Sequence, residues 1–157
     1  EIPVSIQDLD KNIEVAFRLD YWRSFTDKQF ISTLKSSKGK YWIESFFFEL
    51  SCNPLTHPKR YNKSCFKVIE KSIHNLTEKE WQRFNELVEI ANFWYLVYDT
   101  KQMFDGSTWE ISGLERSKYQ DDSFKKFRFR SPKKGNNFRD IGEFMIEKSQ
   151  IDIGRIF

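Results

Sequence analysis

The chain has 157 residues, of which 39% are hydrophobic, 17% aromatic and 31% charged, and its formal net charge is +3. This length suits one domain with one hydrophobic core, and the abundance of aromatic side chains excludes an intrinsically disordered protein. No apolar run approaches the ~20 residues that a membrane-spanning helix needs.

The first predicted element is a strand from Ile13 to Tyr21. Apolar residues occupy its odd-numbered positions, whereas Glu14, Arg18 and Asp20 occupy even-numbered ones. Successive side chains of a strand point to opposite faces, so this alternation indicates a sheet with one buried face.

The next segments are less regular. Residues 25–34 fit either a short helix or a second strand, and the pattern leaves both open. Residues 41–50 are aromatic and apolar on both faces, which predicts a central strand. A loop rich in Pro, Asn and Ser follows over 51–63, and residues 65–73 form an element of undetermined type.

A helix over about 77–95 is predicted next. Thr77 and Glu80 have the spacing of a capping box, in which each side chain accepts a hydrogen bond from the other residue's backbone N–H. The apolar residues that follow recur every three or four positions and predict a core-facing stripe: Trp81, Phe84, Leu87, Val88, Ala91, Trp94 and Tyr95. Residues 93–98 favour strands, so an earlier end of the helix is also consistent.

A hairpin is predicted after the Asp105-Gly106 turn, with strands over 107–114 and 124–130. Strict alternation in the second strand directs Phe127 and Phe129 to the core. It also places Lys126, Arg128 and Arg130 together on the opposite face.

The last predicted element is a helix over about 137–148, capped by Asn136 or Asn137. Together these elements predict one α+β domain over residues 1–157. We expect a predominantly antiparallel sheet, covered on one face by the two helices.

Charge is unevenly distributed along the sequence. Residues 116–139 contain nine Lys or Arg against two Asp, a net +7, whereas residues 70–110 contain eight acids against four bases, a net −4. The two regions could therefore neutralise each other within the fold, or the first could form a basic surface.

The two cysteines, Cys52 and Cys65, bracket the predicted loop. In an oxidising compartment a disulfide between them would contribute about 3 kcal/mol, whereas in a reducing compartment they would remain thiols. The sequence begins at Glu1 rather than at Met. Both a cytoplasmic and an exported, periplasmic location are consistent with it.

No motif predicts a metal, a cofactor or a catalytic residue. His57 and His74 are separated from each other and from carboxylates at ligand spacing. A glycine-rich phosphate loop and a nucleophile elbow are also missing from the sequence.

The residues that could form a binding site are Asp105, Trp109, Glu110, Arg128 and Arg130. In one interpretation the two carboxylates line a pocket in which the two arginines bind an anion. In the other, a tight turn leads into a strand, Trp109 belongs to the core, and Glu110 faces solvent or pairs with Lys125, Arg128 or Arg130.

This stretch, residues 104–146, also resembles a pattern found in small bacterial proteins without an assigned activity. The pattern consists of Asp-Gly-x-x-Trp in a strand, then a Tyr, a cationic strand that ends in Ser-Pro, and an amphipathic helix. The resemblance implies no activity, cofactor or partner.

The sequence therefore favours a non-catalytic binding domain that recognises a protein or an anionic ligand through its sheet face. One alternative is binding of nucleic acid or another polyanion by residues 124–134, where Lys and Arg alternate with Phe. Another is a hydrolase with paired carboxylates, such as Asp105 with Glu110 or Glu44 with Glu49.

Overall fold

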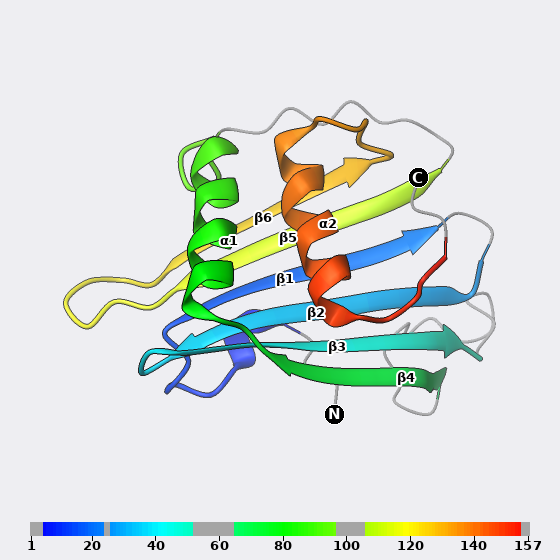
Figure 1. Cartoon of the computed structure of the whole chain (residues 1–157), viewed down its shortest axis with the longest axis horizontal. Helices are drawn as coiled ribbons and strands as arrows, with labels where there is room; N and C mark the ends of the chain where they lie inside the picture. Colours follow the sequence, from blue (N-terminus) through cyan, green and yellow to red (C-terminus); the bar gives the residue numbers. More distant parts are fainter. Residues whose placement is uncertain (1–4, 24–25, 52–64, 97–105, 155–157) are drawn as a thin grey trace.

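Six antiparallel strands form one sheet in the order β4-β3-β2-β1-β5-β6 (Figure 1). The computed structural model describes residues 5–23, 26–51, 65–96 and 106–154. The strands are β1 (Val15–Arg23), β2 (Lys28–Ser37), β3 (Lys40–Leu50), β4 (Phe66–Asn75), β5 (Ser107–Glu115) and β6 (Ser123–Arg130). The fold class is α+β, as the sequence predicted.

The order of the strands departs from the order of the chain at one place. Strands β1 to β4 follow one another as neighbours, after which α1 (Glu78–Ile90) and the segment after it lead to β5, which pairs with β1. The first strand is therefore central, and β4 and β6 are the edges. The two segments of undetermined type, 25–34 and 65–73, supply β2 and β4.

Both helices, α1 and α2 (Asn137–Ser149), lie on the same face of the sheet (Figure 1). We call this face the helix face and the opposite one the back face. Odd-numbered residues of β1 point to the helix face and even-numbered ones to the back face, as the sequence alternation predicted.

Aromatic side chains fill the space between the sheet and the helices. Phe17 of β1 makes edge-on contacts with Phe84 of α1 and with Phe93, at ring-centroid distances of 5.0 and 5.3 Å. Phe127 of β6 contacts Phe93 at 5.1 Å and Phe138 of α2 at the same distance. Offset and edge-on geometries of this kind are the favourable ones for aromatic pairs.

Helix α1 begins as predicted and ends earlier than the predicted limit of about 95. The Thr77 hydroxyl accepts from the Glu80 N–H, and the Glu80 carboxylate accepts from the Thr77 N–H. The helix stops at Ile90 because Asn92 has a φ of 51°, a left-handed conformation that a helix cannot continue. Phe84, Val88 and Ala91 are buried as expected, but Tyr95 is exposed.

Helix α2 approaches the sheet closely because small residues line its path. A β-carbon on Gly142 would lie 2.6 Å from the ring of Trp109, so only glycine fits there. Further along the helix, Ser32, Ser45 and Ser72 form a row across β2, β3 and β4. The Ser72 hydroxyl donates to the carbonyl oxygen of Ser149 at the end of α2 (2.7 Å).

The back face has two small apolar clusters, one at each end. At one end the 3₁₀ segment η1 (Ile6–Asp8) and the residues after it cover β1 and β5, through Ile6, Ile13, Ala16 and Leu114. At the other end Ile31, Phe46 and Phe48 of β2 and β3 pack together. Charged residues occupy the middle of this face. In the parts of the chain described, no helix is long and apolar enough to cross a membrane.

Candidate functional site

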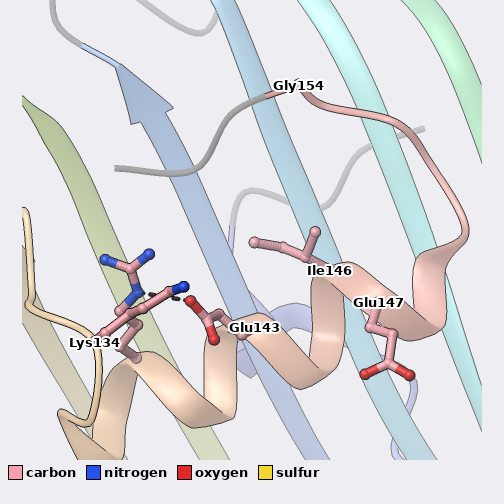
Figure 2. Close-up of a pocket in the computed structure, with 6 residues that line it drawn as sticks. Lys134, Glu143, Ile146, Glu147 and Gly154 are labelled. Carbon is pink, nitrogen blue, oxygen red and sulfur yellow. Dashed lines mark hydrogen bonds and ion pairs between the residues drawn. The ribbon is translucent and has the colours of Figure 1, made fainter.

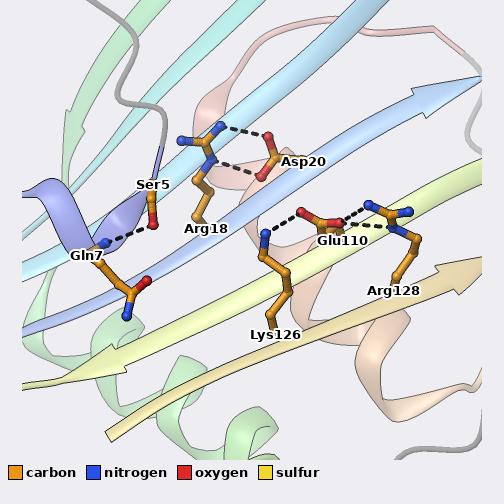
Figure 3. A network of polar contacts seen from close by, with 7 residues as sticks. All are labelled: Ser5, Gln7, Arg18, Asp20, Glu110, Lys126 and Arg128. Atoms are coloured by element: carbon orange, nitrogen blue, oxygen red, sulfur yellow. Dashed lines mark hydrogen bonds and ion pairs between the residues drawn. The ribbon is translucent and has the colours of Figure 1, made fainter. Parts of the chain in front are cut away.

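The candidate site is a group of charged side chains on the back face, at the junction of β1, β5 and β6 (Figure 3). It comprises Arg18 and Asp20 of β1, Glu110 of β5, and Lys126 and Arg128 of β6. We call these five residues the charged cluster. All are even-numbered residues of strands in which the even positions point away from the helices.

Strand register brings the members of the charged cluster together. Asp20 lies directly opposite Glu110 across the β1–β5 pair, and Glu110 lies opposite Arg128 across the β5–β6 pair. Side chains opposite each other in an antiparallel pair have β-carbons about 4.5–5.5 Å apart. The cluster therefore depends on the pairing of β5 with both β1 and β6.

Glu110 is the acceptor for both cations of β6. Arg128 donates from Nε and Nη2 to Oε2 at 2.9 and 2.7 Å, and Lys126 Nζ lies 3.1 Å from Oε1. The Glu110 side chain is only 11% exposed, whereas those of Lys126 and Arg128 are 52% and 58% exposed. The carboxylate is thus buried beneath two cations that reach solvent. The Arg128 guanidinium also lies 5.8 Å from the ring centre of Trp22.

In the second pair of the cluster both the cation and the carboxylate are largely buried. Arg18 donates from Nε and Nη2 to the two oxygens of Asp20, each at 2.8 Å. The Arg18 side chain is 7% exposed and that of Asp20 is 19% exposed. A two-point contact of this kind fixes both side chains and adds geometric specificity to the charge pairing.

The two carboxylates have pKa values displaced in opposite directions. Burial raises the pKa of Asp20 above its usual value, and the nearby charge of Glu110 adds to this, even though Arg18 hydrogen-bonds to Asp20. Burial also acts to raise the pKa of Glu110, but hydrogen bonds from Arg128 and Lys126 outweigh it and the pKa lies below its usual value. Of the two, Asp20 is the easier to protonate.

A second group of charges lies on the back face nearer to β4. Glu44 of β3 accepts from Lys35 of β2 at 2.8 Å and lies 3.3 Å from Lys71 of β4. Burial alone would raise the pKa of Glu44, but these two lysines lower it below its usual value. The back face therefore carries several internally paired charges with an excess of cations.

The predicted site residues are only partly brought together. Glu110 and Arg128 are in direct contact, and Arg130 follows on the same face of β6. Trp109 is fully buried on the helix face, where its indole N–H donates to the Ser107 hydroxyl at 2.9 Å. Trp109 and Glu110 therefore cannot line one pocket, since neighbouring strand residues point to opposite faces. Asp105 lies outside the described residues.

Of the two cysteines, only Cys65 lies within the described residues. Cys65 is buried and disulfide-bonded. Cys52 lies outside the described residues, so the pairing of Cys52 with Cys65 stays a prediction.

A shallow hollow lies on the other side of the molecule, along α2 (Figure 2). Its walls include Lys134, Arg139, Glu143 and Gly154. Arg139 donates to Glu143 and to the carbonyl oxygen of Pro132, both at 2.7 Å, and it lies over the ring of Trp109. These contacts give Arg139 a structural role in attaching α2 to β5.

Sequence reasoning did not single out Arg18 and Asp20, and it named Lys126 only as part of the cationic strand. The alternation of the first strand did contain a signal for Arg18 and Asp20, because both occupy its polar positions. The pairing of β1 with β5, about ninety residues later in the chain, leaves no local mark in the sequence.

Comparisons with protein-family models, with curated proteins and with solved structures find no match to this chain.

Proposed function

We propose that this protein is a non-catalytic binding domain that holds an acidic segment of a protein partner against the back face of its sheet, along β6. The observation that carries the proposal is the row of cations on β6. Lys126, Arg128 and Arg130 all point to this face and are exposed, and the two opposed by Glu110 are held in place by it.

The charge balance of this row favours an anionic partner. The row has three cations, and Glu110 is the one carboxylate that contacts two of them, which leaves about two positive charges at the surface. Among the described residues, Arg130 makes no ion pair. The Glu110 contacts also restrict Lys126 and Arg128 before binding, so less side-chain freedom is lost when a carboxylate docks.

A protein partner fits this surface better than a nucleic acid. Single-stranded nucleic acids are bound by aromatic rings on which bases stack, but Phe127 is buried and Phe129 half-buried, both toward the helices. Phe46 and Phe48, on the back face itself, are buried as well. The remaining pattern, exposed cations over buried carboxylates, has the mixed signs of a protein interface.

The geometry gives less support to a hydrolase. Of the two predicted carboxylate pairs, Glu44 and Glu49 lie on opposite faces of β3, and Asp105 lies outside the described residues. Asp20 and Glu110 do face each other, but each accepts hydrogen bonds from its own cation or cations. In a binding role, the cations that these carboxylates hold in place can contact an acidic partner without rearranging.

The test is a titration of labelled poly-L-glutamate with the protein, followed by fluorescence anisotropy over a salt series. We expect binding at low salt that weakens as salt rises, because exposed charges are screened. Replacing Arg128 and Arg130 by Ala should reduce the affinity at least about tenfold. The variant Lys133→Ala/Lys134→Ala removes the same charge from outside the row, and it should bind like the wild type.

Two results would contradict the proposal. One is the absence of binding to poly-L-glutamate at low salt, and the other is binding that survives the Arg128→Ala/Arg130→Ala substitutions. A parallel titration with single-stranded DNA separates the alternatives. Tighter binding of DNA than of poly-L-glutamate, lost in the same variant, would favour the nucleic-acid function.

A further inference from the structure

Strand β4 is an edge strand that exposes apolar side chains. It has ten residues, and in the described part of the chain no strand lies on its outer side (Figure 1). Val68, Ile69 and Ile73 are exposed on it. The exposed residues of the other edge, β6, are all polar or charged, whereas β4 exposes these three apolar residues beside Lys67, Glu70 and Lys71.

The backbone of β4 alternates between groups that bind β3 and groups that point outward. The Leu76 N–H donates to the carbonyl oxygen of Tyr41, which sets the phase of the ladder. In an antiparallel pair only every second residue hydrogen-bonds to its neighbour, so Ser72 and His74 face β3. The N–H and C=O groups of Lys71 and Ile73 therefore point away from the sheet.

We propose that two copies of this chain associate through β4, antiparallel and centred on Ser72, so that the two sheets become continuous. In this register Lys71 of each copy lies opposite Ile73 of the other, and the outward groups form about four backbone hydrogen bonds. The register irregularity between Phe47 and Phe48 disturbs the first half of β4, which confines the pairing to the second half.

The side chains of β4 are complementary to themselves in this register. Glu70 of one copy lies opposite His74 of the other, and the pair occurs twice about the two-fold axis. A histidine N–H can donate to a carboxylate whether or not the ring is charged. Lys71 lies 3.3 Å from Glu44 of its own chain, so its charge is already paired while its aliphatic stem adjoins Ile73 of the second copy.

Sedimentation equilibrium over a wide range of protein concentrations tests this association. We expect a monomer–dimer equilibrium for the wild type. The substitution Ile73→Lys places two lysines opposite each other at two positions and should weaken the dimer at least about tenfold. Ile90→Lys is the matched control, because Ile90 on α1 is 59% exposed and Ile73 is 58% exposed. This control should dimerise like the wild type.

A charge exchange tests the register itself. His74→Glu places Glu70 opposite a second carboxylate and should weaken the dimer, and Glu70→His/His74→Glu should restore it because each new pair is again complementary. Circular dichroism and the denaturation midpoint confirm that each variant is folded. A wild type that stays monomeric at all concentrations overturns the proposal. This is the result expected if the edge of β4 pairs with a different peptide instead of a second copy of the chain. Dimers that Ile73→Lys leaves intact, or that the exchange does not restore, overturn it as well.

Discussion

The helix face of the sheet is packed by aromatic rings from both helices, whereas the middle of the back face is filled by charged side chains that bind one another. On the helix face Phe17, Phe84 and Phe127 are almost fully buried. On the back face Arg18 and Glu110 are nearly as buried, yet each has an ionic partner. Burial of apolar rings therefore stabilises one face, whereas the other depends on keeping its buried charges paired.

The largest effect is expected on the helix face, from Phe84→Ala. Phe84 is fully buried and contacts Phe17 and Phe144, with ring centroids 5.0 and 5.4 Å away. Removing such a ring typically costs about 3–5 kcal/mol of unfolding free energy. Urea denaturation measures the loss. Tyr95→Ala, at an exposed residue shortly after the same helix, should change the free energy little, and similar losses in both variants would contradict the assignment of the core.

On the back face the expected effect depends on whether a pair is broken or replaced. Asp20→Ala removes the carboxylate that accepts two hydrogen bonds from the buried Arg18 guanidinium and should cost roughly 3 kcal/mol of unfolding free energy. Replacing both residues, as Arg18→Met/Asp20→Leu, should cost much less, since two apolar side chains need no partner. A double variant as unstable as the single one would show that the back face needs the ionic pair itself.

Helix α2 provides a third test, because its packing depends on a close approach of the helix to the sheet at Gly142. In an ordinary helix interior Gly→Ala stabilises by about 1 kcal/mol. At Gly142 the added β-carbon would lie 2.6 Å from the ring of Trp109, so we expect Gly142→Ala to destabilise by about 1–2 kcal/mol instead. Glu147→Ala, at a mostly exposed position of the same helix, is the control. A stabilised Gly142→Ala variant would show that the helix can move away from the sheet.

The sequence predicted the helix face better than the back face, and the reason is physical. Period-two alternation in β1 and β6 and the Thr77–Glu80 capping box are local signals, and the structure confirms all three. The sequence left open whether the helix reaches about residue 95 or ends earlier, and it ends at Ile90. The left-handed conformation of Asn92 is not evident from an Asn within an apolar stretch.

The charged cluster was less predictable because it depends on which strands are neighbours. The alternation placed Arg18 and Asp20 on the polar face of the first strand and Arg128 on the polar face of the cationic strand. Only the insertion of β5 between β1 and β6 joins these faces through Glu110. The same alternation separates Trp109 from Glu110, although the two are neighbours in the proposed pocket motif.

The smallest expected effect concerns the contribution of Glu110 to the unfolding free energy and how it changes with pH. Its pKa is lower in the folded protein than in the unfolded chain, because the hydrogen bonds from Arg128 and Lys126 outweigh burial. A carboxyl group of this kind stabilises the fold above its unfolded pKa, and the stabilisation is lost as the pH falls through the folded pKa. Asp20 acts in the opposite sense, since its pKa is raised by burial and protonation favours the folded state.

Glu110→Gln should therefore cost about 1 kcal/mol at neutral pH, a modest value because solvent screens two cations that are more than half exposed. The difference from the wild type should shrink as the pH falls through the lowered folded-state pKa of Glu110, because the wild-type carboxyl group is then protonated as well. Urea denaturation at several pH values measures this. Glu86→Gln, which removes the exposed partner of Arg83 on α1, should have no measurable effect. If the loss of unfolding free energy in Glu110→Gln stays the same at acidic pH, the loss comes from packing rather than from charge. The two faces would then not differ in their dependence on electrostatics.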